Sequence, residues 1–254
     1  MLLKDKAILI VGAGGLLGRE IVRAVVREGG RVVAADRFLD LVEPLADEIG
    51  RDKVIPCQID ITKKESIKSV FDLAENSFER LNGAVNTAYP KNKNYGREAL
   101  NVTYDDFCEN VSLHLGGYFL FMQQCAEYSK QHDTDFSLVN MSSIYGSIAP
   151  KFEIYEKTSM TMPVEYAAIK SAVQHTTAYF NAFMKGGRFR ANCVSPGGIL
   201  ADQPSEFLKS YKDRCSSKGM LDSTDITGSV VYLVSDFSKY VVGQNITIDD
   251  GFSV

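Results

Sequence analysis

The chain has 254 residues, 45% of them hydrophobic and 24% charged, with a net charge of −4 at pH 7. That length suits one large α/β domain or two small ones, and it is enough to bury roughly three quarters of the unfolded surface. The acidic balance argues against a nucleic-acid partner, and the lack of any run of ~20 apolar residues argues against a membrane span. Five scattered cysteines without a CxxC pair argue against a disulfide framework or a metal site, and favour a reducing, cytoplasmic location.

Short β-rich apolar runs alternate along the chain with segments that carry apolar residues at helical spacing. The predicted strands are residues 7–11, 31–35, 54–58, 83–87, 136–141, 190–195 and 245–248. The predicted helices are residues 16–27, 39–49, 64–78, 105–128, 164–184 and 225–235. This alternation predicts an α/β fold of the Rossmann type, a doubly wound parallel sheet of seven strands in a single domain over residues 1–254.

Two segments interrupt the alternation, residues 148–162 and residues 200–221. Long insertions in folds of this kind usually lie over a binding site. We therefore expect both segments near the active site. The first of them, which includes residues 151–157, would suit a polar, hydroxyl-rich substrate, but an exposed or oligomer-contacting loop is an equal alternative.

A glycine-rich turn follows the first predicted strand, with Gly12, Gly15 and Gly18 spaced G-x-x-G-x-x-G and Leu17 before the last glycine. Dinucleotide binding needs glycines here, because the chain turns tightly, exposes backbone N–H groups to a pyrophosphate and packs the helix close to the sheet. A tight strand-to-helix turn without a ligand is the alternative. The position of the turn, in the first βα unit, favours nucleotide binding.

Carboxylates follow the second and third predicted strands. Asp36 is placed to accept hydrogen bonds from the adenosine ribose hydroxyls and to repel a 2′-phosphate, which favours NAD over NADP. Arg37 comes next and weakens this preference, since a guanidinium pairs with phosphate. Asp60 could reach the adenine amino group. Both carboxylates have the alternative of capping a turn or helix.

The pattern Tyr-x-x-x-Lys occurs twice, at Tyr89 with Lys93 and at Tyr166 with Lys170. The bare pattern is expected about once by chance, so its context has to decide. The first pair is interrupted by Pro90 and a polar run, which predicts a loop. The second pair lies in a predicted helix, where i,i+4 spacing stacks both side chains on one face.

That second pair has a chemical use. The pKa of a free tyrosine is about 10. To act as a base near neutral pH the tyrosine needs this pKa lowered by ~3 units, and a neighbouring ammonium helps to lower it. Ser143, at the end of the preceding strand, could hold the substrate oxygen. A routine strand-end serine is the alternative for this residue.

These motifs, in this order, resemble the short-chain dehydrogenase/reductase family over residues 5–251. The resemblance implies a nicotinamide cofactor and a small-molecule substrate, with Ser143, Tyr166 and Lys170 as catalytic residues. The residues that it assigns to the cofactor are Gly12, Gly15, Leu17, Gly18, Asp36, Arg37, Asp60, Ile61, Asn86, Ala88, Tyr166, Lys170, Pro196, Gly197 and Ile199, the last three along the nicotinamide. It further implies a homodimer or homotetramer built through helices 105–128 and 164–184.

Four departures from the family pattern stand out. Val11 replaces a threonine, and the second glycine of the turn is displaced, as in the longer epimerase branch. Tyr89 replaces a glycine and places a phenol near the cofactor. The interval from Ser143 to Tyr166 is longer than usual.

The fourth departure is His114, which occupies the position of the family's active-site asparagine and is the last predicted catalytic residue. The asparagine holds a water that links the lysine to solvent. An imidazole makes similar hydrogen bonds but titrates at about 6.5, so we expect it to add charge beside Lys170 at acid pH. The alternative is a histidine bonded to a backbone carbonyl and unconnected to catalysis.

The sequence therefore predicts an NAD-dependent oxidoreductase that transfers hydride between nicotinamide and a hydroxyl or carbonyl group of a small polar substrate. It most resembles bacterial oxidoreductases of flagellin modification, which suggests a sugar or nucleotide-sugar precursor. Two alternatives are a nucleotide-sensing regulatory protein of the same fold and a lyase or epimerase that uses bound NAD.

Overall fold

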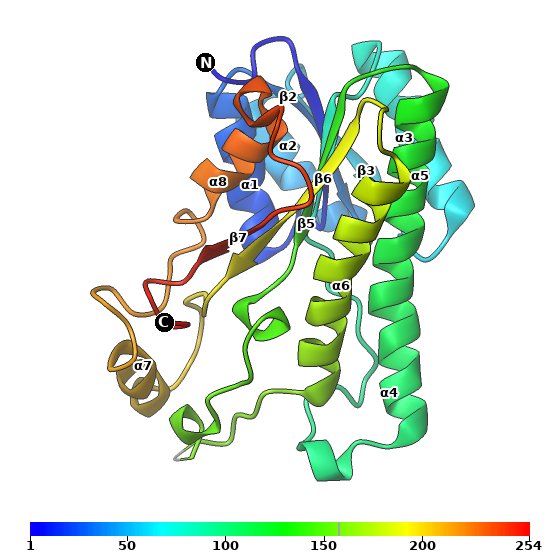
Figure 1. The fold of residues 1–254 in the computed structure, drawn as a ribbon. Coiled ribbons are helices and arrows are strands. Elements are labelled where there is room, and N and C mark those ends of the chain that lie inside the picture. Colours follow the sequence, from blue (N-terminus) through cyan, green and yellow to red (C-terminus); the bar gives the residue numbers. More distant parts are fainter. Residues whose placement is uncertain (157) are drawn as a thin grey trace.

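A seven-stranded parallel sheet forms the centre of the protein in this computed structural model, which describes residues 1–156 and 158–254 (Figure 1). The strand order is β3-β2-β1-β4-β5-β6-β7, and each neighbouring pair is parallel. The prediction of a doubly wound, Rossmann-type sheet is thereby confirmed. The strands are β1 (Ala7–Val11), β2 (Arg31–Asp36), β3 (Val54–Gln58), β4 (Gly83–Asn86), β5 (Phe136–Met141), β6 (Phe189–Pro196) and β7 (Asn245–Ile248).

Helices cover both faces of the sheet, as the near-continuous apolar runs of its strands require. Figure 1 shows one layer on each side, and each layer packs on its own apolar core. One layer holds α1 (Leu16–Arg27), α2 (Glu43–Ile49) and α8 (Thr227–Val234). The other holds α3 (Lys64–Phe78), α4 (Tyr104–Asn110), α5 (Gly117–Gln131) and α6 (Val164–Phe183). Among the described residues, no helix is both long and apolar enough to cross a membrane.

Three helices differ from the prediction. The segment 39–49 is divided into a 3-10 turn, Leu39–Leu41, and α2, because Pro44 lies at the start of α2 and lacks the N–H that a continuous helix needs. The segment 105–128 is continuous but contains a π-helix, Val111–Gly116, between α4 and α5. The insertion 200–221 contains a helix that was not predicted, α7 (Ser205–Lys212).

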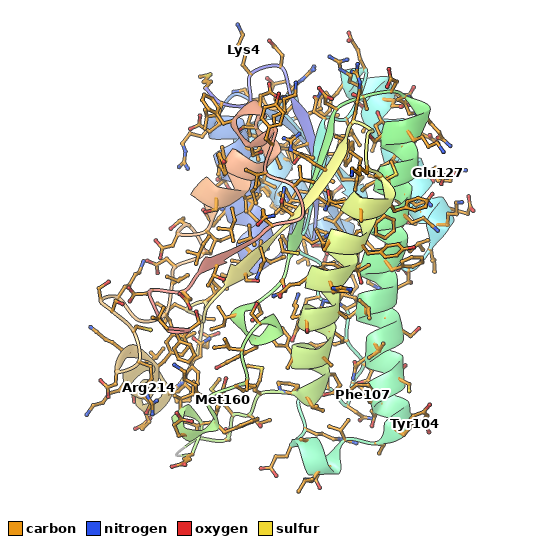
Figure 2. The ribbon with its side chains drawn as sticks, in the orientation of Figure 1. Lys4, Tyr104, Phe107, Glu127, Met160 and Arg214 are labelled. Atoms are coloured by element: carbon orange, nitrogen blue, oxygen red, sulfur yellow. The ribbon has the colours of Figure 1, made fainter. Side chains whose placement is uncertain are left out.

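The two insertions pack on each other beyond the carboxyl ends of the strands, where the reversal of strand order between β1 and β4 also opens a crevice. Their rings are in contact, with the centroids of Tyr155 and Phe207 5.2 Å apart. Figure 2 shows Met160 of the first insertion and Arg214 of the second at this end of the molecule. Residue 157, part of the segment expected to contact substrate, lies outside the described residues.

Candidate active site

Three adjoining cavities lie along the carboxyl ends of the strands. The β2-side cavity, of about 480 Å³, is bounded by the ends of β1, β2 and β3, and the central cavity, of about 260 Å³, lies between the glycine turn and Lys170. The insertion-side cavity, of about 300 Å³, lies between Tyr166 and the two insertions. Tyr89 lines all three, so they form one cleft.

The glycine turn fits a dinucleotide. Gly12 has a φ of 77°, and a Cβ there would lie 2.6 Å from the Thr87 hydroxyl oxygen. A Cβ on Gly18 would collide with the backbone of Gly12, so α1 can approach the turn only because this residue is glycine. Gly15 caps α1 without a side chain, which leaves the first backbone N–H groups of the helix open to an anion.

Asp36 and Asp60 both line the β2-side cavity, and both also hold local backbone. The Asp36 carboxylate accepts hydrogen bonds from the backbone N–H groups of Gly14, at 3.0 Å, and of Phe38, at 3.3 Å. Asp60 accepts from the N–H and the hydroxyl of Thr62, at 3.0 and 2.6 Å. Each carboxylate is therefore fixed in orientation beside the cavity, and the structural and the cofactor-binding roles are compatible.

Most of the residues assigned to the cofactor lie along the cleft, and Asn86 does not. Asn86 is fully buried, and its side-chain oxygen accepts a hydrogen bond of 3.1 Å from the Ala88 N–H. It therefore shapes the loop after β4 from beneath. Those that line the central or the β2-side cavity are Gly12, Gly15, Leu17, Gly18, Asp36, Arg37, Asp60, Ile61, Ala88, Tyr166, Lys170, Pro196, Gly197 and Ile199.

Lys170 is buried at the base of the central cavity. Its ammonium donates a hydrogen bond of 2.8 Å to the Met141 carbonyl at the end of β5, and lies 3.4 Å from His114 Nε2. Burial lowers the pKa of Lys170 from 10.5 to about 7, with Cys193 opposing the shift. The lysine can therefore exchange a proton near neutral pH.

His114 lies in the π-helix, a local widening that is often found at functional sites. An ammonium has no acceptor, so with Lys170 charged, His114 Nε2 accepts and the ring proton is on Nδ1. Burial, and then the charge of Lys170, lower the pKa of His114 well below 6.5. The expectation that this imidazole becomes charged at mildly acid pH is therefore wrong, whereas the expected proximity to Lys170 is found.

Tyr166 lies between the central and the insertion-side cavities, one helical turn before Lys170. Its ring centroid is 5.6 Å from the Lys170 ammonium. Burial raises the pKa of Tyr166, and a hydrogen bond with Ser143 opposes this. The phenol is thus protonated in the resting protein, next to a hydroxyl and an ammonium that stabilise its anion.

Several lining residues were not assigned to the site from the sequence. Tyr89 was expected near the cofactor but not among the site residues. Tyr145, Tyr155 and Tyr211 line the insertion-side cavity, and the last two come from the insertions. For Tyr155 and Tyr211 the only signal in the sequence was the length of the insertions, and for Tyr145 there was none.

The chain is similar to known proteins over almost its whole length. Residues 12–253 match the family described as enoyl-(acyl carrier protein) reductase. The post-translational flagellin modification protein A of Campylobacter coli is 35% identical over 257 residues, 100% of each chain, and the L-rhamnose-1-dehydrogenase of Scheffersomyces stipitis is 28% identical over 100% of this chain and 98% of its own. A short chain dehydrogenase from Leptospira borgpetersenii solved with bound NAD+ has a TM-score of 0.87 at 31% identity, covering 99% of this chain and 94% of its own. The chain is a short-chain dehydrogenase/reductase.

Membership of this family makes the protein an oxidoreductase that uses a nicotinamide cofactor. When bound, the cofactor supplies the hydride donor or acceptor. The glycine turn, with Asp36 and Asp60, would hold its nucleotide half. Lys170, with Pro196, Gly197 and Ile199, would hold the nicotinamide half.

Burial of the Lys170 ammonium predicts a pH-dependent stability. The fall in pKa from 10.5 to about 7 corresponds to a cost of roughly 5 kcal/mol while the lysine is charged in both states. Between these two values the unfolded chain binds the proton and the folded protein does not, so the free energy of unfolding rises with pH. We expect Lys170→Met to melt above the wild type at about pH 6, and this advantage to shrink towards about pH 9.5. Thermal unfolding of the cofactor-free proteins at several pH values measures this difference in melting temperature. Lys130→Met, at an exposed lysine, is the control. A difference that grows as the pH rises would contradict the expectation.

The contact between His114 and Lys170 predicts unequal effects of two substitutions. His114→Asn should keep most of kcat, because an amide can replace the hydrogen bond, whereas His114→Ala should lose roughly 10²-fold. Because the imidazole stays neutral, the acid limbs of the wild-type and His114→Asn pH–rate profiles should superimpose. Near-normal turnover by the alanine variant would remove His114 from the mechanism.

Proposed function

We propose that the protein is an NAD-dependent dehydrogenase or reductase acting on a hydroxyl or carbonyl group of a small, polar, sugar-like substrate. One observation carries this proposal: Ser143, Tyr166 and Lys170 converge where the central cavity opens into the insertion-side cavity. A substrate in the outer cavity would place its reacting carbon between these residues and the nicotinamide.

The three residues divide the proton chemistry. The Ser143 hydroxyl holds the substrate oxygen, and the Tyr166 hydroxyl gives a proton to that oxygen during reduction or takes it during oxidation. Lys170 stabilises the phenolate with its charge. His114 receives a hydrogen bond from Lys170 and keeps the ammonium directed towards the cleft.

The lining of the insertion-side cavity supports a hydroxyl-bearing substrate. The described lining side chains are uncharged and mostly apolar, and the polar ones include the hydroxyls of Tyr145 and Tyr155, which bond each other, the hydroxyl of Thr161, and the Gln203 amide, which bonds the backbone of Ile199 and Ala201. Hydroxyl and amide groups recognise hydroxyls, and aromatic faces suit the apolar face of a sugar ring. Similarity to L-rhamnose-1-dehydrogenase and to the flagellin modification protein is consistent with a sugar or nucleotide-sugar precursor of flagellin glycan.

We also propose that the protein acts in the cytoplasm as a homodimer or homotetramer built on α5 and α6. Phe119 of α5 and Tyr179 and Phe183 of α6 are exposed, and the last two rings stack with centroids 6.4 Å apart. Exposed apolar groups of this kind mark interaction sites. All five cysteines are free, which suits a reducing compartment. The mass in solution, measured by light scattering, tests the assembly.

The orientation of Asp36 predicts the cofactor. NAD should bind at least about tenfold more tightly than NADP, because the carboxylate accepts from the ribose diol and repels a 2′-phosphate. Asp36→Ala should narrow the difference and leave Arg37 to attract phosphate, whereas Asp40→Ala, at an exposed neighbouring carboxylate, should not. Titration calorimetry measures both affinities, and equal affinities in the wild type would contradict the preference for NAD.

The proposed function is tested by an absorbance screen for NADH over neutral sugars, amino sugars, polyols and nucleotide sugars. We expect wild-type turnover with a member of these classes. Tyr166→Phe should lose more than about nine tenths of it while NAD affinity stays within a few-fold, since only the proton-transferring oxygen is removed.

Two other outcomes of the screen identify the alternatives. Cofactor binding by the wild type without any turnover would indicate a nucleotide-sensing regulatory protein. Conversion of substrate without net formation of NADH, with the cofactor tightly retained, would indicate a lyase or epimerase.

A further inference from the structure

The Lys170 ammonium is desolvated without a carboxylate partner among the described residues. The groups that face it come from five helices and strands and from the loop after β4. Met141 of β5 gives a carbonyl, His114 of the π-helix a neutral imidazole, and Cys193 of β6 a thiol whose pKa burial raises to about 11. The remaining groups are aromatic rings, from the loop after β4 and from α5 and α6.

Three tyrosine rings surround the ammonium. The distances from Lys170 Nζ to the ring centroids are 5.3 Å for Tyr118, 5.6 Å for Tyr166 and 5.8 Å for Tyr89. A cation within ≈ 6 Å of an aromatic face is attracted by the ring quadrupole, most strongly where water is excluded. The rings therefore offset part of the cost of burying this ammonium.

Tyr89 differs from the other two rings in the partner of its hydroxyl, which is the Tyr95 hydroxyl. The Tyr118 hydroxyl donates to backbone carbonyls of Asn86 and Met141, and Tyr166 is the proposed proton-transfer group. Tyr89 instead packs edge-on against Tyr166, with ring centroids 5.8 Å apart, and against His114, at 5.2 Å. It is therefore in contact with two of the groups that surround the lysine, His114 and Tyr166.

The loop that carries Tyr89 is held in place. The Tyr89 hydroxyl lies 2.6 Å from the Tyr95 hydroxyl. Between them, Asn92 binds Asn110 through its backbone N–H, at 2.9 Å, and Asp106 through its side chain, at 3.0 Å. These contacts tie the loop to α4, so the ring is fixed although its side chain is partly exposed.

We propose that Tyr89 is a positioning residue that completes an aromatic cage of Tyr89, Tyr118 and Tyr166 around the Lys170 ammonium, and so keeps this lysine charged and directed at Tyr166. The ring, and not the hydroxyl, performs this role. The consequence for catalysis rests on the proposed function, whereas the effect on the lysine itself does not.

The first test is a titration of Lys170 in protein labelled with ¹³C-lysine, followed by NMR and assigned with Lys170→Met. Tyr89→Leu removes the ring while keeping an apolar side chain, and should lower the titration midpoint of Lys170 by about one pH unit. Tyr89→Phe keeps the ring and should leave the midpoint unchanged. Tyr89→Met is a second ringless variant should the leucine variant fail to fold.

A matched control is available on the surface. Tyr240 is 89% exposed and has the Lys239 ammonium 5.9 Å from its ring centroid. Tyr240→Leu therefore removes a similar cation–ring pair that is in contact with solvent. It should leave Lys170 unchanged. The proposal would be overturned if Tyr89→Leu left the titration midpoint of Lys170 unchanged. It would also be overturned if Tyr89→Phe shifted that midpoint as much as Tyr89→Leu does.

The second test is kinetic and uses the substrate found in the screen. In the direction of carbonyl reduction, Tyr89→Leu should lower kcat about tenfold near neutral pH and shift the loss of activity to lower pH, and Tyr89→Phe should restore both. A change in KM alone, or equal effects of Leu and Phe, counts against the cage. Absence of turnover in the wild type would refute the proposed function, and the NMR titration would still decide the role of Tyr89.

Discussion

The ammonium of Lys170 reaches the Met141 carbonyl because α6 is fastened to the end of β5. The Ser142 hydroxyl donates a hydrogen bond of 2.9 Å to the backbone carbonyl of Lys170, and the Gln174 amide donates to the Ser142 oxygen at 3.1 Å. At Gly146 a Cβ would lie 2.7 Å from the Lys170 backbone, so a larger residue would force the segment away. The placement of the charge, the phenol one turn before it and the serine facing that phenol all depend on this junction.

Much of the fold was predictable because the information is local. A parallel sheet covered on both faces needs continuous apolar strands, and β1 and β5 are buried at each position. Pro44 is a local signal too, and it could have marked the start of α2. The π-helix is different: over the six residues Val111–Gly116, one extra residue per turn leaves no trace in the apolar spacing. The π-helix, and the buried position that it gives His114, can be seen only in the structure.

The candidate site divides in the same way. Ser143, Tyr166 and Lys170 were found because their spacing matters to the chemistry, and the glycine turn because backbone geometry requires it. The surroundings that set their pKa values come from elements distant in the chain, so no spacing could show that His114 is buried and neutral. Tyr89 illustrates this limit. It occupies a glycine position of the family, and only the structure brings its ring to Lys170, His114 and Tyr166.

The wall of the insertion-side cavity is a separate apolar cluster, held apart from the two cores that support the sheet. Its centre is Phe252, which is fully buried and stacks on Tyr211 with ring centroids 4.3 Å apart. Lys151 of the first insertion donates a hydrogen bond of 2.6 Å to the Phe252 carbonyl, and Glu153 pairs with Arg214 of the second at 3.0 Å. These contacts join the insertions to each other and to the end of the chain, and α6 meets the cluster through Tyr166. The Ser142 and Gln174 hydrogen bonds that hold Lys170 lie outside the cluster, so the wall can be repacked for another substrate while that junction stays in place.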